Sequence, residues 1–210
     1  MPGWRSRAAQ DHRNVRVAQT LVSRWSGRVD QDGAVPSFCS VRNASPQDAA
    51  ACVAIYAPYV LDTAITFEIE PPPPEEMARR ISKAQTTHAW LVLEDRDEVV
   101  GYAYGVPYKP RPAYRWSCEV SVYLEQGRRR SGAGRALYDA LLARLAGRGY
   151  RTALAGMALP NEASVGLHRA LGFEHAGTLR GVGWKLGAWH DVALMQRPLS
   201  TTKEPPAEPR

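Results

Sequence analysis

A segment that joins a strand, a basic glycine-bearing turn and a helix constrains the fold of this chain most. The apolar run from Trp116 to Leu124 has strand character, and the turn from Arg128 to Arg135 holds two glycines. Apolar residues then recur at helical spacing from Ala136 to Leu145. Glycines let a backbone approach a phosphate closely, and the first amide N–H groups of a helix have no partner inside it. The segment therefore predicts a cradle for a phosphorylated ligand.

Two common phosphate-binding turns do not fit this segment. Gly134 is followed by Arg135 and Ala136, so the lysine and the hydroxyl of a nucleotide P-loop are missing. Leu137 stands where a dinucleotide-binding turn needs its third glycine. Taken alone, the turn is equally compatible with a solvated arginine cluster before an ordinary helix. Glu119, on the strand before the turn, adds a candidate general base.

The length and composition indicate one globular domain with short extensions. The chain has 210 residues, 44% of them hydrophobic, and a formal net charge of +6. Residues 1–37 read as a basic, disordered extension and residues 200–210 as a disordered tail, which leaves 38–199 as the folded part. The three cysteines are odd in number and form no Cys-x-x-Cys pair, which favours a reducing, cytoplasmic setting without a structural zinc site or any other metal. No apolar run is long enough to span a bilayer, and the small charge excess gives no reason to expect nucleic acid as a partner.

The folded part alternates strands and helices. Strands are expected at 38–42, 89–93, 99–106, 116–124, 152–157, 173–180 and 183–196, with a short extended piece at 66–69. Helices are expected from Ser45 to a stop near Pro58, from Pro74 to about Lys83, through the central stretch to Gly147, and from 161 to 171. The order predicts an α+β fold with a single sheet and helices on its faces.

A second group of polar residues lies on the last helix. Asn161 can cap that helix, and Ser164 and His168 are four residues apart, so that they share one face. Gly172 ends the helix and Phe173 begins the next strand. An isolated histidine in this setting is more often solvated than functional.

A third group lies in the connection from 107 to 116, which concentrates cations and aromatic rings next to Glu119. One reading is a proline-rich surface connection. The other is a pocket wall in which Lys109 and Arg111 bind a carboxylate and Tyr108 and Tyr114 orient the ligand.

These motifs together resemble a known enzyme family. Residues 129–134 fit the signature R/Q-x-x-G-x-G/A of the GNAT superfamily of acetyl-CoA-dependent N-acetyltransferases, and residues 161–173 fit its second motif, N-x-x-S-x-x-x-H/Y-x-x-x-G-F. With 63–67, 119–123, 159–161 and 187–192, the chain resembles the phosphinothricin and methionine sulfone/sulfoximine N-acetyltransferases over about 41–199. The resemblance implies a mixed, mostly antiparallel sheet flanked by helices on both faces, and a homodimer.

The resemblance also implies roles for individual residues. It places Glu119 and His168 in the catalytic site. It places acetyl-CoA against the strand residues Val122, Tyr123 and Leu124, against Asn161, and against the turn residues Arg129, Arg130, Ser131, Gly132, Ala133, Gly134 and Arg135. It places Phe67, Lys109, Arg111 and Tyr114 in the pocket of a small amine substrate.

The chain departs from this family at one pocket position. Phosphinothricin-specific members carry Phe-Arg where this chain has Phe67-Glu68. An anion in place of a cation should weaken binding of a doubly anionic substrate and favours one with a neutral polar head, such as methionine sulfone or sulfoximine.

Three functional hypotheses follow. The first is a small-molecule amino-acid N-acetyltransferase with Glu119 as general base, His168 as proton donor or relay, and backbone N–H groups near Val122 and Tyr123 for the oxyanion. The second is an acetyltransferase for a protein amine or a tRNA-linked amino acid. The third is a non-catalytic module that binds acetyl-CoA or nucleic acid. The cations and aromatic rings of the 107–116 connection favour the first.

Overall fold

The computed structural model describes residues 39–128, 131–201 and 207–209. Its elements are β1 (Cys39–Asn43), η1 (Pro46–Asp48), α1 (Ala49–Asp62), α2 (Pro74–Thr87), β2 (Ala89–Asp95), β3 (Glu98–Pro107), η2 (Pro112–Tyr114), β4 (Ser117–Leu124), α3 (Ala133–Gly147), β5 (Thr152–Ala158), α4 (Glu162–Ala170), β6 (Glu174–Lys185) and β7 (Ala188–Pro198). The predicted extension 1–37 lies outside the described residues. In the tail, the Trp116 Nε1–H donates to the Ala207 carbonyl at 3.0 Å and Arg115 pairs with Glu208 at 2.9 Å.

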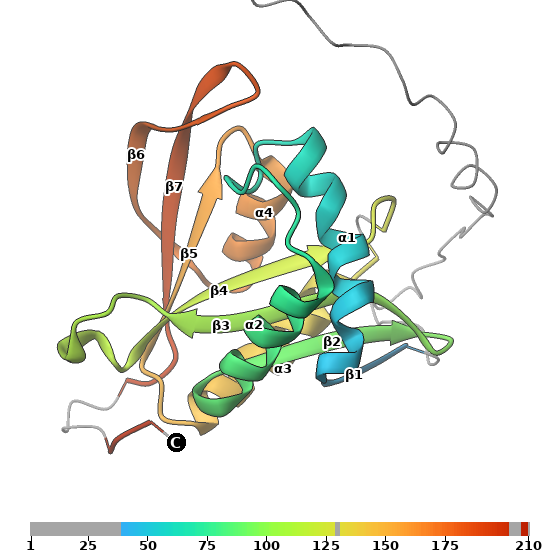
Figure 1. Ribbon diagram of the computed structural model, residues 1–210. Helices are drawn as coiled ribbons and strands as arrows, with labels where there is room; N and C mark the ends of the chain where they lie inside the picture. Colours follow the sequence, from blue (N-terminus) through green and yellow to red (C-terminus); the bar gives the residue numbers. More distant parts are fainter. Residues whose placement is uncertain (1–38, 129–130, 202–206, 210) are drawn as a thin grey trace, which may run out of the picture.

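One mixed sheet organises the molecule, which confirms the predicted α+β class (Figure 1). The strand order is β1-β2-β3-β4-β5-β7-β6, and every neighbouring pair is antiparallel except β4 and β5. A two-residue turn at Arg96 and Asp97, both at positive φ, joins β2 to β3 and forms the predicted hairpin.

Helices cover both faces of the sheet. Buried residues of α1 and α2, such as Ile55 and Ile81, pack with Trp90, Val92 and Tyr102 on one face. The opposite face packs against α3 and the end of α4; its buried set includes Leu91, Ala103, Val120, Leu137, Leu141 and Leu171. Because side chains alternate along a strand, Val120 and Val122 face α3, whereas Glu119, Ser121 and Tyr123 face the side of α1 and α2.

Helix α1 departs from its predicted end. Its start is as expected, with Ser45 before Pro46 and the Ser45 N–H donating to Asp48 Oδ2 at 2.7 Å. The predicted stop near Pro58 is wrong, because α1 contains Pro58 and continues to Asp62. Proline removes one helical hydrogen bond. Tertiary contacts offset that cost: Val60 is buried, and the Tyr59 hydroxyl donates to the Leu124 carbonyl at 2.7 Å.

Two further boundaries also differ from the sequence prediction. The short extended piece expected at 66–69 lies in the α1–α2 loop, residues 63–73, which has no regular secondary structure. The hairpin turn expected at 181–182 lies instead at Leu186 and Gly187, both at positive φ. Gly181, at φ +52°, forms an irregularity within β6, where the register to β7 shifts between Leu179 and Gly183. A glycine inside a strand pattern is compatible with either a turn or a bulge.

Candidate active site

Strands β4 and β5 diverge and open a cleft in the sheet. Residues Ser117 to Glu119 of β4 pair in parallel with Thr152 to Leu154 of β5. Beyond them, β4 runs on to Leu124 and β5 to Ala158 without pairing with each other. A narrow cavity of about 40 Å³ lies at the divergence; it is lined by Val120 to Tyr123, Ala155 to Met157, Ile65, Tyr138, Asn161, Ser164 and His168. The fold thus brings together β4, β5, α3, α4 and the α1–α2 loop.

The hydrogen-bonding direction of β4 decides which of its amides face the cleft. The Glu125 N–H donates to the Val100 carbonyl on the β3 side at 2.9 Å. Direction alternates along an antiparallel ladder, and the β3–β4 register is unbroken. The N–H of Tyr123 therefore also faces β3, whereas those of Val122 and Leu124 face away from it, toward the divergence. Of the two amides expected to meet an oxyanion, the geometry favours Val122.

Glu119 is the last residue of β4 that pairs with β5, and it lies at the mouth of the cleft. A Cβ built on Gly156 of β5 would stand 4.0 Å from Glu119 Oε1, so the carboxylate reaches across toward β5. Burial raises the pKa of Glu119, and the positive charge of Lys109 opposes that rise. A carboxylate with a raised pKa at the edge of a cleft is well suited to general base catalysis.

Glu68 and Arg80 add a charged pair on the same face of the sheet as Glu119. Arg80 of α2 donates to the two carboxylate oxygens of Glu68 at 2.6 and 3.3 Å, and the Tyr56 hydroxyl donates to Glu68 at 3.3 Å. The charges of Glu119, Arg80 and Glu68 all influence Tyr104, whose pKa is raised chiefly by burial. Glu68 therefore lies near the cleft as half of an ion pair rather than as an isolated anion.

His168 is buried, with both ring nitrogens engaged. Nδ1 lies 2.7 Å from the Ser164 carbonyl oxygen, which can only accept, so Nδ1 carries the proton. Nε2 is then an acceptor for the Tyr138 hydroxyl at 3.0 Å. Burial lowers the pKa of His168, which keeps this neutral form at pH 7. The histidine thus fixes the direction of the Tyr138 hydroxyl at the wall of the cleft.

The basic turn leads into α3 with a left-handed residue. Gly132 has φ +77° at the N-cap, a conformation that glycine adopts without strain. Ser131 Oγ accepts from the Ala133 N–H at 3.3 Å and donates to the Arg128 carbonyl at 2.8 Å. Arg129 and Arg130, predicted to bind the cofactor, lie outside the described residues. The α3 N-terminus thus presents backbone N–H groups of the kind that bind phosphate, on the helix whose Tyr138 lines the cleft.

Three predicted cofactor residues also have structural contacts. A Cβ at Gly134 would lie 3.1 Å from Leu167 Cδ2, so this glycine lets α3 pack closely on α4. Arg135 donates to the Ala170 carbonyl at 3.0 Å, near the end of α4. Asn161 caps α4, as predicted, by accepting from the Ser164 N–H at 3.1 Å.

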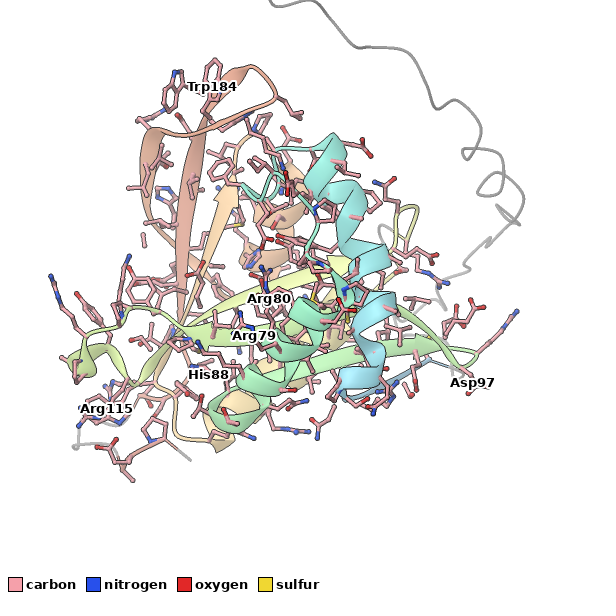
Figure 2. The ribbon with its side chains drawn as sticks, in the orientation of Figure 1. Arg79, Arg80, His88, Asp97, Arg115 and Trp184 are labelled. Atoms are coloured by element: carbon pink, nitrogen blue, oxygen red, sulfur yellow. The ribbon has the colours of Figure 1, made fainter. Side chains whose placement is uncertain are left out.

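The predicted substrate residues occupy two different places. Lys109, Arg111 and Tyr114 lie on the exposed β3–β4 connection; the Lys109 ammonium stands 5.1 Å from the Tyr108 ring centroid, and the Tyr114 ring lies edge-on to Tyr108 at 5.7 Å. Phe67 lies in the α1–α2 loop and packs against β6 at Gly183. Figure 2 shows Arg80 on α2, Arg115 at the outer end of the β3–β4 connection and Trp184 at the tip of the β6–β7 hairpin.

Sequence reasoning missed four residues of this site: Arg80, Tyr104, Tyr138 and Gly156. None of them belongs to a local motif, and only the sheet register and helix packing bring them to the cleft. The alternation of Tyr102 and Tyr104 in β3 indicated a shared face but not which partner it would meet. Among the described residues, no group of acidic, histidine or cysteine side chains is arranged to hold a metal ion, and no helix is long and apolar enough to cross a membrane.

Comparisons with known proteins point to the same enzyme family as the sequence motifs. The model of the acetyltransferase (GNAT) domain family matches residues 41–194. A phosphinothricin N-acetyltransferase of Streptomyces viridochromogenes is 39% identical over 170 residues, which cover 81% of this chain and 91% of that protein. An L-methionine sulfoximine/L-methionine sulfone acetyltransferase of Pseudomonas paraeruginosa is 34% identical over 172 residues, covering 80% and 98%.

A solved structure shares the fold and holds the co-substrate. It is a GNAT superfamily phosphinothricin acetyltransferase from Sinorhizobium meliloti in complex with acetyl-CoA, with a TM-score of 0.77 and 37% identity over 81% of this chain and 94% of that one. The divergence of β4 and β5 and the glycine turn before α3 are the features of this chain that suit such a ligand. The chain therefore belongs to the GNAT acetyltransferase family, as an enzyme that uses acetyl-CoA as its co-substrate.

Proposed function

We propose that this enzyme acetylates the α-amino group of a small amino-acid-like substrate of the methionine sulfone, methionine sulfoximine or phosphinothricin type. The observation that carries the proposal is the half-buried Glu119 carboxylate at the point where β4 and β5 part. The names of the relatives support the substrate class. The transfer is direct, with Glu119 as general base and no covalent enzyme intermediate.

In this proposal the N-terminal end of α3 and its glycine turn bind the pyrophosphate. The Ala133 N–H donates to Ser131 Oγ, whereas the amide N–H groups of Gly134 and Arg135 have no carbonyl one turn earlier in the helix, and the helix dipole favours an anion there. The divergence of β4 from β5 receives the thioester arm. Acetyl-CoA supplies the activated acetyl group, and the Val122 N–H stabilises the negative charge that develops on the carbonyl oxygen.

Glu119 removes the proton that an ammonium substrate must lose before attack. The raised pKa of Glu119 lies closer to the pKa of the amine, while the positive charge of Lys109 favours the ionised form of the carboxylate. Neutral His168 has no proton to give at Nε2, so it acts by orienting the Tyr138 hydroxyl. The nitrogen loses two protons in all: Glu119 passes the first to solvent and then carries the second from the attacking nitrogen to the departing thiolate.

The charges around the cleft favour a substrate with one anionic group. Lys109 and Arg111 bind the substrate carboxylate, and the influence of the Lys109 charge on the pKa of Glu119 supports a place near the cleft. Arg80 is paired with Glu68 at 2.6 Å and with Glu76 at 2.8 Å, so it offers no unpaired cation for a second anionic group. Methionine sulfone or sulfoximine is therefore preferred over phosphinothricin.

A panel assay tests the proposal. The purified enzyme is incubated with acetyl-CoA and single amines, and thiol release is measured with a free amino acid, its carboxylate ester, a peptide with a free N-terminus and an aminoacyl-tRNA. Turnover of free methionine sulfone, lost on esterification, is the expected result. Turnover of the peptide or the tRNA alone would support the second hypothesis instead.

A further inference from the structure

Lys185, at the end of β6, is buried in the folded part of the chain. The residue is only 5% exposed, and burying an ammonium group is costly unless its hydrogen bonds are satisfied. Nζ donates to the Thr66 carbonyl at 2.7 Å and to the Glu68 carbonyl at 2.8 Å. Both acceptors belong to the α1–α2 loop, so the cation ties that loop to β6.

Phe67, between the two acceptors, makes a second contact with β6. A Cβ built on Gly183 would stand 2.3 Å from the Phe67 ring atoms Cε2 and Cζ, so the ring lies against bare backbone. Gly183 pairs with His190 of β7, and the His190 ring centroid lies 6.3 Å from that of Phe67. Any side chain at position 183 would displace the phenyl ring.

The same loop forms one wall of the cleft. Ile65 lines the cavity between β4 and β5. The Glu68 carboxylate is held by Arg80 at 2.6 Å while its backbone carbonyl is held by Lys185. Contacts to the backbone, to a ring and to a carboxylate thus fix consecutive residues of a loop that has no regular secondary structure of its own.

We propose that Lys185 and Gly183 are positioning residues that preform the amine-binding wall from Ile65, Phe67 and Glu68. This inference rests on the proposed function. Ordering a loop before the substrate arrives lowers the entropic cost of binding, so releasing the loop should weaken amine binding in particular. The α3 end and the β5 side of the cleft, where acetyl-CoA is proposed to bind, do not depend on these contacts.

The test compares three variants of the contact: Lys185→Met, Lys185→Arg and Gly183→Ala. The Lys185→Met side chain keeps the length of lysine but cannot donate a hydrogen bond. The control is Lys83→Met, on the exposed side of α2. For Lys185→Met and Gly183→Ala we expect KM for the amine to rise on the order of tenfold, with acetyl-CoA affinity unchanged. Amide hydrogen exchange across residues 63–70 should speed up in both. Lys185→Arg should restore part of the loss, and Lys83→Met should match wild type.

Two results would overturn the inference. One is that folded Lys185→Met and Gly183→Ala proteins show the same hydrogen exchange in the loop and the same KM for the amine as the Lys83→Met control. The other is an equal loss of amine and acetyl-CoA binding, which would indicate general destabilisation. If wild type acetylated no amine, the proposed function would fail by itself, and the exchange comparison would still decide whether Lys185 holds the loop.

Discussion

Replacing Glu119 by glutamine is the most direct test of the proposed mechanism. The amide keeps the size of the side chain beside Gly156 and removes a partly buried charge, so the fold and its melting temperature should be retained. Loss of a positioned general base costs about 10²–10⁴ in kcat, or roughly 3–5 kcal/mol in the activation barrier. Acetyl-CoA affinity should stay the same, because its proposed contacts lie elsewhere.

The pH dependence gives this prediction its sharpest form. Below the pKa of its ammonium group, the neutral fraction of the amine substrate rises by about tenfold for each pH unit. The deficit of Glu119→Gln should therefore shrink by up to about tenfold for each pH unit below that pKa, since more of the substrate arrives deprotonated. Wild-type kcat/KM should fall as pH drops through the raised pKa of Glu119, whereas in the variant only the titration of the substrate amine should remain.

Steady-state thiol release from pH 6 to 9, with calorimetry for acetyl-CoA binding, measures both effects. The control is Glu98→Gln, the same change at an exposed position of β3, which should behave like wild type. A Glu119→Gln enzyme with wild-type turnover at neutral pH would show that the carboxylate is only structural. A deficit that did not depend on pH would also refute its role as the base.

Three further predictions concern the cofactor, the substrate and stability. Gly134→Val should abolish acetyl-CoA binding measured by calorimetry and, because the new side chain meets Leu167, should also lower the melting temperature; unchanged affinity would refute the phosphate cradle. Glu68→Gln removes one of the two carboxylates paired with Arg80, the other being Glu76, and Glu68→Arg adds a cation, so both should raise kcat/KM for phosphinothricin relative to methionine sulfone; an unmoved ratio would remove Glu68 as a specificity determinant. His88 is buried against Tyr150 and its pKa is lowered to about 4, below the ordinary 6.5 of the unfolded chain. The unfolded chain therefore binds the extra proton, and the free energy of unfolding from urea titrations should fall by up to about 3 kcal/mol as pH drops from 6.5 to 4, with a smaller fall in His88→Phe.

The sequence by itself determined the parts of this protein that depend on local pattern. The strand, glycine turn and helix around Gly132, the cap at Asn161 and the β2–β3 hairpin each follow from residues that are close in sequence, because backbone conformation and capping are local effects. The motifs, through their resemblance to the GNAT signatures, also predicted Glu119 as a candidate base and the glycine turn as a candidate acetyl-CoA contact. Pro58 misled for the same reason: its local cost was visible, whereas the packing of Val60 and Tyr59 that offsets it was not.

Only the tertiary structure decided how distant residues share the cleft. The end of pairing at Glu119 and Leu154 opens the sheet, and sheet register then sets Tyr104 and Gly156 beside it. The pairing of Glu68 with Arg80 turns an apparent lone anion into an ion pair, and the contact of Lys185 with the α1–α2 loop joins segments more than a hundred residues apart. Such contacts depend on long-range packing and on which partner satisfies each buried charge, and neither is written in any short stretch of sequence.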